Sequence, residues 1–150
     1  MLLSKTSEYG IRAMLHLAGL SSNEYLSVKR ISENLNISFH FLTKIFQQLS
    51  KAGLIDSYRG PNGGVRLSQD PKAINVRAVV VALDGDGLFT QCVLGLPGCT
   101  HDRPCPLHAQ WTDSRKEIER MLGEKTLEDV GNDLRAGGYR LNPGQEWSDA

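Results

Sequence analysis

Three cysteines and one histidine lie close together in the sequence and are the residues best suited to bind a metal. Cys92, Cys99 and Cys105 are the only cysteines of the 150-residue chain, and His108 follows with the spacing Cys-x6-Cys-x5-Cys-x2-His. Thiolate sulfur is the ligand that iron–sulfur clusters and soft or borderline metal ions prefer. Glycines and prolines interrupt this segment, which predicts an irregular loop that can wrap around a metal centre.

The same residues are compatible with three kinds of chemistry. Three cysteines and one histidine form an ordinary tetrahedral Zn²⁺ site, and thiolates also hold iron–sulfur clusters. Two of the thiols could instead form a disulfide on oxidation. Cys105 and His108 are three residues apart at the predicted start of a helix, so both can face one metal. An odd number of clustered cysteines argues against a secreted disulfide scaffold and predicts a cytoplasmic protein with reduced thiols.

Composition and charge favour a protein that binds nucleic acid. No apolar stretch approaches the ~20 residues needed to span a bilayer, so no membrane association is expected. Residues 1–83 contain ten Lys/Arg and five Asp/Glu, a net charge of +5, whereas residues 84–150 contain seven and twelve, a net charge of −5. This asymmetry fits a DNA-binding part followed by a part that does not touch DNA. The sequence has no recognisable catalytic motif, so no enzymatic activity is expected.

The first half of the sequence predicts a helix-turn-helix. A first helix is expected over 5–19, where apolar residues recur at helical spacing. Ser27 can cap a short second helix, and Ser38 can cap a third helix over about 39–52 that Gly53 ends. Two helices joined by a few residues, with a new cap before the second, are typical of this motif.

The third predicted helix has an apolar stripe and a polar stripe on different faces. Residues at i, i+3, i+4 and i+7 form the apolar stripe, which should pack inward: Leu42, Ile45, Phe46 and Leu49. The polar stripe is either a solvated face or, as its place in the helix pair favours, a surface for the major groove.

Two strand-like runs over 54–58 and 65–67 flank a glycine-rich turn and predict a β-hairpin. A hairpin directly after a helix-turn-helix is a wing. Arginines beside its tip either face water or enter the narrow minor groove, and we favour the groove. The residues predicted to contact DNA are Ser38, His40, Phe41, Thr43, Lys44, Gln47, Arg59, Gly60 and Arg66. Phe41 is expected to touch a thymine methyl group.

The second half predicts further helices. Residues 74–83 should form a strand-like segment leading into a short buried helix, with a strand over 79–81 as the alternative. Pro106 fits the first turn of a longer helix over about 106–123, and a short helix is expected over 126–134. The long helix has apolar residues at heptad positions, which serve either an intramolecular core or, as we favour, dimerisation: Leu107, Trp111, Ile118 and Met121.

The predicted fold is therefore mainly α with a small β-wing. A winged helix-turn-helix over 1–83 would bind DNA, and a cluster-binding loop would occupy 84–105. A dimerisation helix and a short following helix would span 106–135, and a disordered tail would span 136–150.

With these features, the chain resembles the IscR/NsrR-type family of winged-helix iron–sulfur transcription regulators. The resemblance covers about residues 1–135 and rests on the motifs at 9–14, 51–54 and 59–64 and on the three cysteines. It implies a homodimeric regulator, favoured as a repressor, that binds a palindromic operator in double-stranded DNA. Such a regulator senses iron–sulfur cluster status, redox state or nitric oxide through a labile cluster.

The resemblance also implies which residues hold the cluster. The family's three cysteines correspond to Cys92, Cys99 and Cys105. In IscR-like members a histidine at the place of His108 completes a [2Fe–2S] cluster, which is the preferred expectation. In NsrR-like members the cluster can be [4Fe–4S], with a carboxylate from the first helix of the partner subunit, and Glu8 stands near that place. The alternative function is a DNA-binding protein with a structural zinc ion or a thiol switch instead of a cluster.

Overall fold

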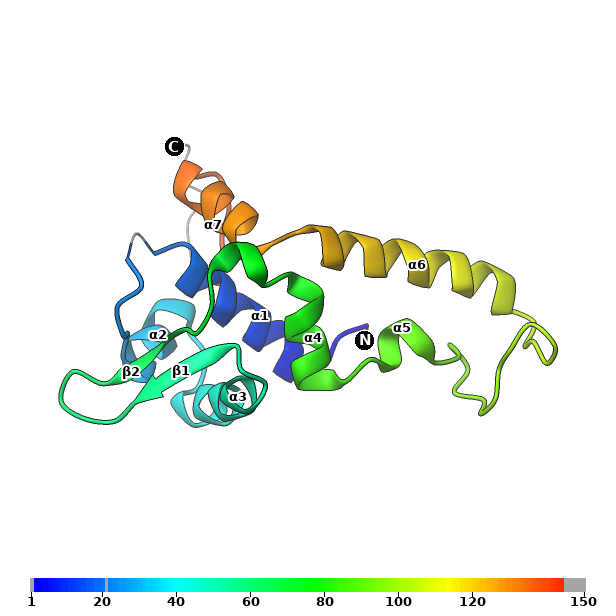
Figure 1. Ribbon diagram of the computed structural model, residues 1–150, viewed down its shortest axis with the longest axis horizontal. Coiled ribbons are helices and arrows are strands. Elements are labelled where there is room, and N and C mark those ends of the chain that lie inside the picture. The colour runs from blue at the N-terminus through cyan, green and yellow to red at the C-terminus, as the bar shows by residue number, and fades with distance from the viewer. Residues whose placement is uncertain (1, 21, 145–150) are drawn as a thin grey trace.

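The computed structural model, which describes residues 2–20 and 22–144, is mainly helical with one small β-hairpin (Figure 1). The elements in chain order are α1 (Lys5–Ala18), α2 (Val28–Leu35), α3 (Phe39–Lys51), β1 (Ile55–Tyr58), β2 (Gly64–Leu67), the 3-10 turn η1 (Pro71–Ala73), α4 (Val76–Asp84), α5 (Gly87–Thr90), α6 (His108–Glu124) and α7 (Leu127–Ala136). The predicted winged helix-turn-helix followed by a long helix is confirmed. None of the described helices is long and apolar enough to cross a membrane.

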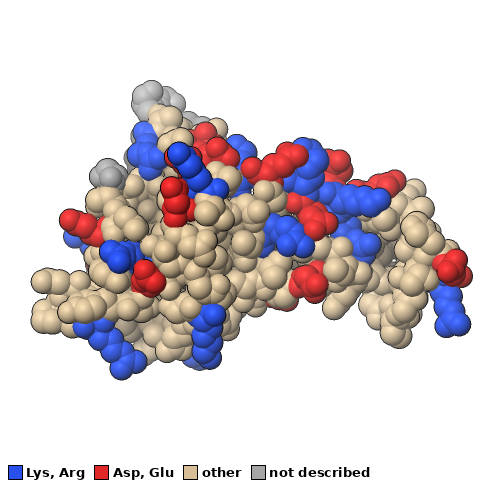
Figure 2. All heavy atoms as spheres, in the orientation of Figure 1, with Lys and Arg blue, Asp and Glu red and all other residues tan. Residues whose placement is uncertain are grey.

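Helix α6 forms an arm that extends away from the winged helix, with the cysteine loop at its far end (Figure 1). No residue of α6 is buried within the chain. Near its C-terminal end the arm contacts α4, and there Arg77 forms an ion pair with Glu119 at 2.9 Å. Side chains of both charge signs crowd the surface of α6 and α7 (Figure 2).

The predicted helix caps are confirmed. The side-chain oxygens of Ser27 and Ser38 accept hydrogen bonds from backbone N–H groups in the first turns of α2 and α3. Between these helices, Asn36 adopts the left-handed conformation with φ of 53°, which reverses the chain within a few residues. Gly53 has φ of 77° and follows the end of α3, as its role as a helix stop requires.

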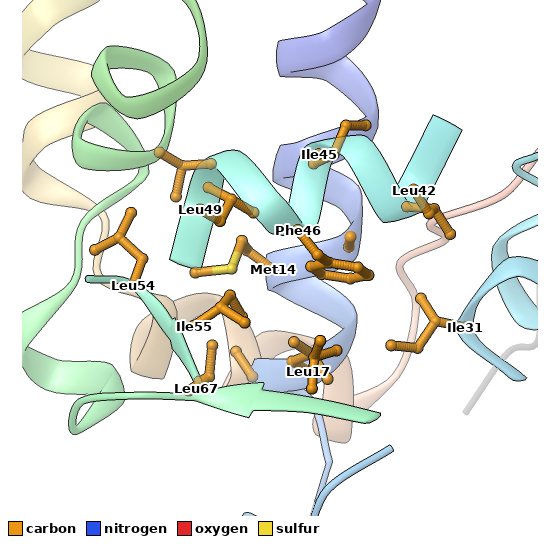
Figure 3. Close-up of a cluster of buried hydrophobic side chains, with 14 of the residues drawn as sticks. Met14, Leu17, Ile31, Leu42, Ile45, Phe46, Leu49, Leu54, Ile55 and Leu67 are labelled. Carbon is orange, nitrogen blue, oxygen red and sulfur yellow. The ribbon is translucent and has the colours of Figure 1, made fainter. Parts of the chain in front are cut away.

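Apolar side chains from α1, α2, α3 and the hairpin form the core (Figure 3). The predicted inner stripe of α3 is buried, and α1 contributes Met14 and Leu17 from the opposite side. Helix α4 approaches α1 closely at Gly10, where a Cβ atom would collide with the Leu83 side chain. The core thus fixes α3 against α1 and leaves its other face free.

The wing is anchored to the segment before α2. Strands β1 and β2 pair antiparallel, with Ile55 opposite Leu67 and Tyr58 opposite Gly64. Leu26 and Val65 exchange two backbone hydrogen bonds of 2.9 Å each. Gly64 has φ of 154°, and a Cβ atom there would collide with the Leu26 carbonyl oxygen. Only glycine therefore allows the hairpin to sit this close to α2.

In the second half, two predictions need correction and one short helix was not predicted. The alternative strand over 79–81 is wrong, because α4 spans the segment and buries Val79 and Val80 completely. The short helix α5 is absent from the sequence-based expectations. Helix α6 starts at His108 rather than at Pro106, because residues 104–107 continue the irregular loop.

The helix predicted over 126–134 is present as α7, which Thr126 and Asp129 begin with reciprocal side-chain-to-backbone hydrogen bonds. The predicted disordered tail begins at residue 136. The described part of that stretch contacts the winged helix instead: Arg12 donates a hydrogen bond to the Leu141 carbonyl, and Asn142 donates one to the Asn34 carbonyl at 2.7 Å. Residues 145–150 lie outside the described residues.

Candidate metal centre and nucleic-acid interface

The loop between α5 and α6 brings the three cysteine side chains together. The Sγ atoms of Cys92, Cys99 and Cys105 all lie within 4.8 Å of one another. Between the Sγ atoms of Cys92 and Cys105 the distance is 3.6 Å. Among the described residues this is the one group of three or more metal-ligand side chains at such short range. The three cysteine side chains are thus brought together within one chain.

His108 stands at the edge of this group, at the first residue of α6. Its Nδ1 atom lies 3.2 Å from the Cys99 Sγ atom, and its backbone N–H donates to the Cys105 carbonyl at 3.0 Å. Its Nε2 atom is buried and has no hydrogen-bond partner among the described residues. The ring of His101 contacts it edge-on, with 5.1 Å between ring centroids. The nitrogen of His108 that faces the thiols is therefore Nδ1, while Nε2 points to a buried site without a partner among the described residues.

The cysteines differ in their tendency to ionise. Backbone N–H groups of Leu96 and Leu94 lower the pKa of Cys92 from 9.0 to about 7, because they stabilise the thiolate. Burial raises the pKa of Cys105, since the charged form loses solvation there. A positively charged metal would offset this cost by binding the thiolate directly.

The donor set fits a thiolate-binding metal or cluster. Three sulfur atoms and a partly buried imidazole are ligands that zinc and iron–sulfur clusters share. Glu8 does not belong to the cysteine group of its own chain, because it lies on α1 and forms an ion pair with Lys5 at 2.8 Å.

The outer face of α3 and the wing form a surface that carries positive charge. Segment 38–67 contains four Lys/Arg and one Asp. Figure 2 shows basic side chains along the lower edge of the molecule, where α3 and the wing lie. The predicted DNA-contacting residues of α3 that are exposed are Ser38, His40, Lys44 and Gln47. Thr43 is half-buried, and its hydroxyl donates to the Phe39 carbonyl at 2.9 Å.

The three wing residues of the prediction occupy different positions. Arg59 and Gly60 are exposed at the tip, and Arg59 forms no hydrogen bond or ion pair with any described residue. Arg66 lies at the base of the hairpin, where its guanidinium stacks on the Tyr25 ring at 4.4 Å and its Nε atom is 3.8 Å from Asp56. Arg59 is thus free to reach a groove, whereas Arg66 is held by its neighbours.

From the sequence, a thymine contact is predicted for Phe41 and none for Phe39, and the structure shows that these two phenylalanines differ in exposure. The Phe41 ring packs edge-on against Tyr9, with 5.4 Å between ring centroids, and borders the core. Phe39, at the first residue of α3, is 46% exposed. The two residues flank the buried stripe on opposite edges, so helical spacing alone does not tell which one α1 covers.

Comparisons with known proteins agree with this architecture. Residues 3–133 match the Rrf2 family, described as iron-dependent transcriptional regulators. The HTH-type transcriptional regulator IscR of Yersinia pseudotuberculosis is 36% identical over 132 residues, which cover 88% of this chain and 80% of that protein.

Two solved structures show the same fold. CymR, the global cysteine regulator of B. subtilis, superposes with a TM-score of 0.74 at 28% identity, over 87% of this chain and 96% of that one. T. potens IscR gives 0.71 at 30% identity, over 88% and 87%. These relatives are DNA-binding regulators rather than enzymes, as the sequence led us to expect. The chain belongs to the Rrf2 family of transcriptional regulators.

Proposed function

We propose that this transcription regulator acts in the cytoplasm as a homodimeric repressor that senses iron–sulfur status, redox state or nitric oxide through a labile cluster. The observation that carries the proposal is the group of three cysteines and His108 at the far end of the α6 arm. A cluster held there would supply the sensitivity, because oxidants, nitric oxide and iron shortage remove or alter iron–sulfur clusters.

The proposed ligands are Cys92, Cys99, Cys105 and His108, holding a [2Fe–2S] cluster. The short sulfur–sulfur distances and the 3.2 Å between the His108 Nδ1 atom and the Cys99 Sγ atom support this set. A [4Fe–4S] cluster completed by Glu8 from the partner chain is the alternative. In either case the three cysteines lie on a loop that α5 and α6 hold at its two ends.

Anaerobic reconstitution tests the ligand set. Each cysteine variant to alanine, and His108→Ala, should lose or alter the visible absorption spectrum of the protein. His101→Ala is the matched control, since His101 touches the His108 ring but is exposed, and it should keep the wild-type spectrum. Mössbauer spectroscopy that shows four irons per cluster, or an unchanged spectrum in His108→Ala, would favour Glu8. A colourless protein with stoichiometric zinc would replace the cluster with a structural metal site.

One observation favours a second candidate, a thiol switch without a cluster. The 3.6 Å between the Sγ atoms of Cys92 and Cys105 places these two thiols within reach of a disulfide after a small side-chain movement. Mass spectrometry of the oxidised, metal-free protein identifies the linked pair. A protein that binds its operator equally when reduced and when disulfide-linked would exclude this switch.

We also propose that α6 forms the dimer interface. Of the heptad positions, Leu107 directly before α6 and Met121 within it are 43% and 55% exposed in one chain, while Trp111 and Ile118 are half-buried. Burying this stripe against a second copy would remove apolar surface from water. Met121→Glu should shift the protein towards monomer in sedimentation experiments. Lys116→Glu, an exposed change on the same helix, should leave the dimer intact.

On DNA, we propose that α3 enters the major groove and that Arg59 enters the minor groove. A two-fold dimer would then read a palindromic operator with one winged helix on each half-site. Arg59→Ala should weaken binding most where the half-site contains an A-tract, because A-tracts narrow the minor groove. Equal loss on all sequences would indicate a phosphate contact instead.

A further inference from the structure

Phe39 is an exposed aromatic side chain at the start of the helix proposed to read DNA. Within residues 4–67, the exposed large hydrophobic side chains of the described residues are Phe39 and Tyr58, at 46% and 55%. Phe39 lies on α3 and Tyr58 on the wing, and these are the two elements that carry the proposed DNA contacts. Phe39 follows the cap residue Ser38 directly, so its ring belongs to the first turn of α3.

The chain leaves about half of the Phe39 side chain exposed. Its ring contact is with the neighbouring residue His40, at 5.7 Å between ring centroids. In contrast, Phe41 is packed against Tyr9 at the border of the core. A ligand with an apolar group could cover the exposed half of this ring and remove its apolar surface from water.

The chemistry of the major groove supplies one apolar group, the C5 methyl of thymine. In helix-turn-helix proteins the N-terminal residues of the second helix contact the base edges, and Phe39 is the first residue of α3. Thr43, one turn later, donates its hydroxyl hydrogen to the Phe39 carbonyl at 2.9 Å, so this hydrogen is already used in a bond to the helix backbone. This first turn therefore offers DNA an apolar ring beside polar side chains.

We infer that Phe39 is a specificity-determining residue that recognises the methyl group of a thymine in each operator half-site. The inference rests on the proposed placement of α3 in the major groove. Because Phe39 touches only the methyl group in this role, it would select thymine over cytosine without a hydrogen bond to the base.

The test removes the methyl group alone. An operator is first selected from random duplexes by the wild-type protein, and each thymine is then replaced singly by deoxyuridine in synthetic duplexes. Replacing the recognised thymine in one half-site should weaken wild-type binding about fourfold, the usual effect of one methyl group lost from an apolar contact. Phe39→Ala should bind the thymine and deoxyuridine duplexes with equal affinity at one fixed salt concentration.

Two further variants keep the result interpretable. Lys44→Ala should weaken binding to both duplexes and keep the preference for thymine. Phe39→Leu should retain part of the preference, and it replaces the alanine variant if that variant binds too weakly to measure.

The outcomes are distinct. An undiminished preference for thymine in Phe39→Ala, or in Phe39→Leu where the alanine variant cannot be measured, would overturn the inference while leaving the DNA-binding proposal intact. So would the absence of a wild-type preference for thymine at every position. Failure to select any operator would instead overturn the proposed DNA contacts.

Discussion

Gly64→Ala tests whether the close approach of the wing to α2 depends on a missing side chain. Gly64 has φ of 154°, and a Cβ atom there would collide with the carbonyl oxygen of Leu26. The obstacle is backbone, so no side-chain rotation can relieve it. The hairpin must move away from the segment before α2, which breaks the two hydrogen bonds between Leu26 and Val65.

The expected cost has two parts. A residue with a side chain in such a backbone conformation costs about 1–3 kcal/mol. Each of the two lost hydrogen bonds costs about 1 kcal/mol. The sum predicts a loss of about 3–5 kcal/mol in the free energy of unfolding, and each kcal/mol lowers the melting temperature by about 2–4 °C in a protein of this size.

Urea denaturation of the metal-free protein measures this loss, because metal binding would otherwise add to the stability. All variants are compared at the same protein concentration, because dimerisation makes the measured stability depend on it. Gly53→Ala is the matched control. Gly53 also has a positive φ, of 77°, but a Cβ atom added there would meet no neighbouring atom within 4 Å. Only backbone strain of about 1–2 kcal/mol is therefore expected. If Gly64→Ala costs no more than Gly53→Ala, the collision does not hold the wing in place and the reasoning fails.

Three further predictions concern the core, a helix cap and pH. Ile45→Ala should destabilise the protein by about 2–5 kcal/mol because Ile45 is buried in the core, whereas the exposed Gln48→Ala should change little in the same urea experiment. Ser4→Ala should cost about 1 kcal/mol, because the Ser4 hydroxyl caps α1, and exposed Ser22→Ala serves as its control. Burial lowers the pKa of His16 below 6.5, so the unfolded chain binds a proton more readily and stability should fall below that pH. His16→Gln should flatten this decline in urea titrations between about pH 7.5 and about pH 5.5, and an unchanged slope would assign it to other groups.

The helix-turn-helix could be predicted from sequence because its signals are local. Ser27 and Ser38 begin helices through hydrogen bonds to N–H groups only a few residues away. The buried stripe of α3 follows from helical spacing within one element. The four residues of α5 carry no such signal, because the helix is about one turn long and has no side-chain cap. Periodicity cannot be recognised over so short a segment.

Contacts between distant segments decided what the sequence could not predict. Phe39 and Phe41 have the same chemistry and lie at opposite edges of the buried stripe of α3, and only the placement of Tyr9 on α1 makes one of them a border residue of the core. Arg66 belongs to the predicted wing, but Tyr25 and Asp56 hold its side chain at the hairpin base. For the cysteines the spacing was informative, since a loop that contains all three had to bring them close.

The attachment of the arm bears on how a change at the cysteines could reach DNA. Helix α6 ends at a backbone junction with the start of α4, where Val76 donates to the Lys125 carbonyl at 3.1 Å and Leu127 donates to the Ile74 carbonyl at 2.8 Å. At its other end, the Trp111 indole donates to the Gln91 carbonyl at 2.9 Å, directly before Cys92.

Helix α4 in turn packs against both α1 and α3. A shift of the arm that follows ligand gain or loss would therefore press on α4 before it reached the recognition helix. This path supports the proposed sensor and predicts that a change at the contact between α6 and α4 interrupts the coupling between the cluster and DNA binding. Arg77→Ala, which removes the ion pair between α4 and Glu119 on the arm, should reduce the difference in operator affinity between the cluster-loaded and cluster-free dimers. An unchanged difference would mean that this ion pair carries none of the coupling.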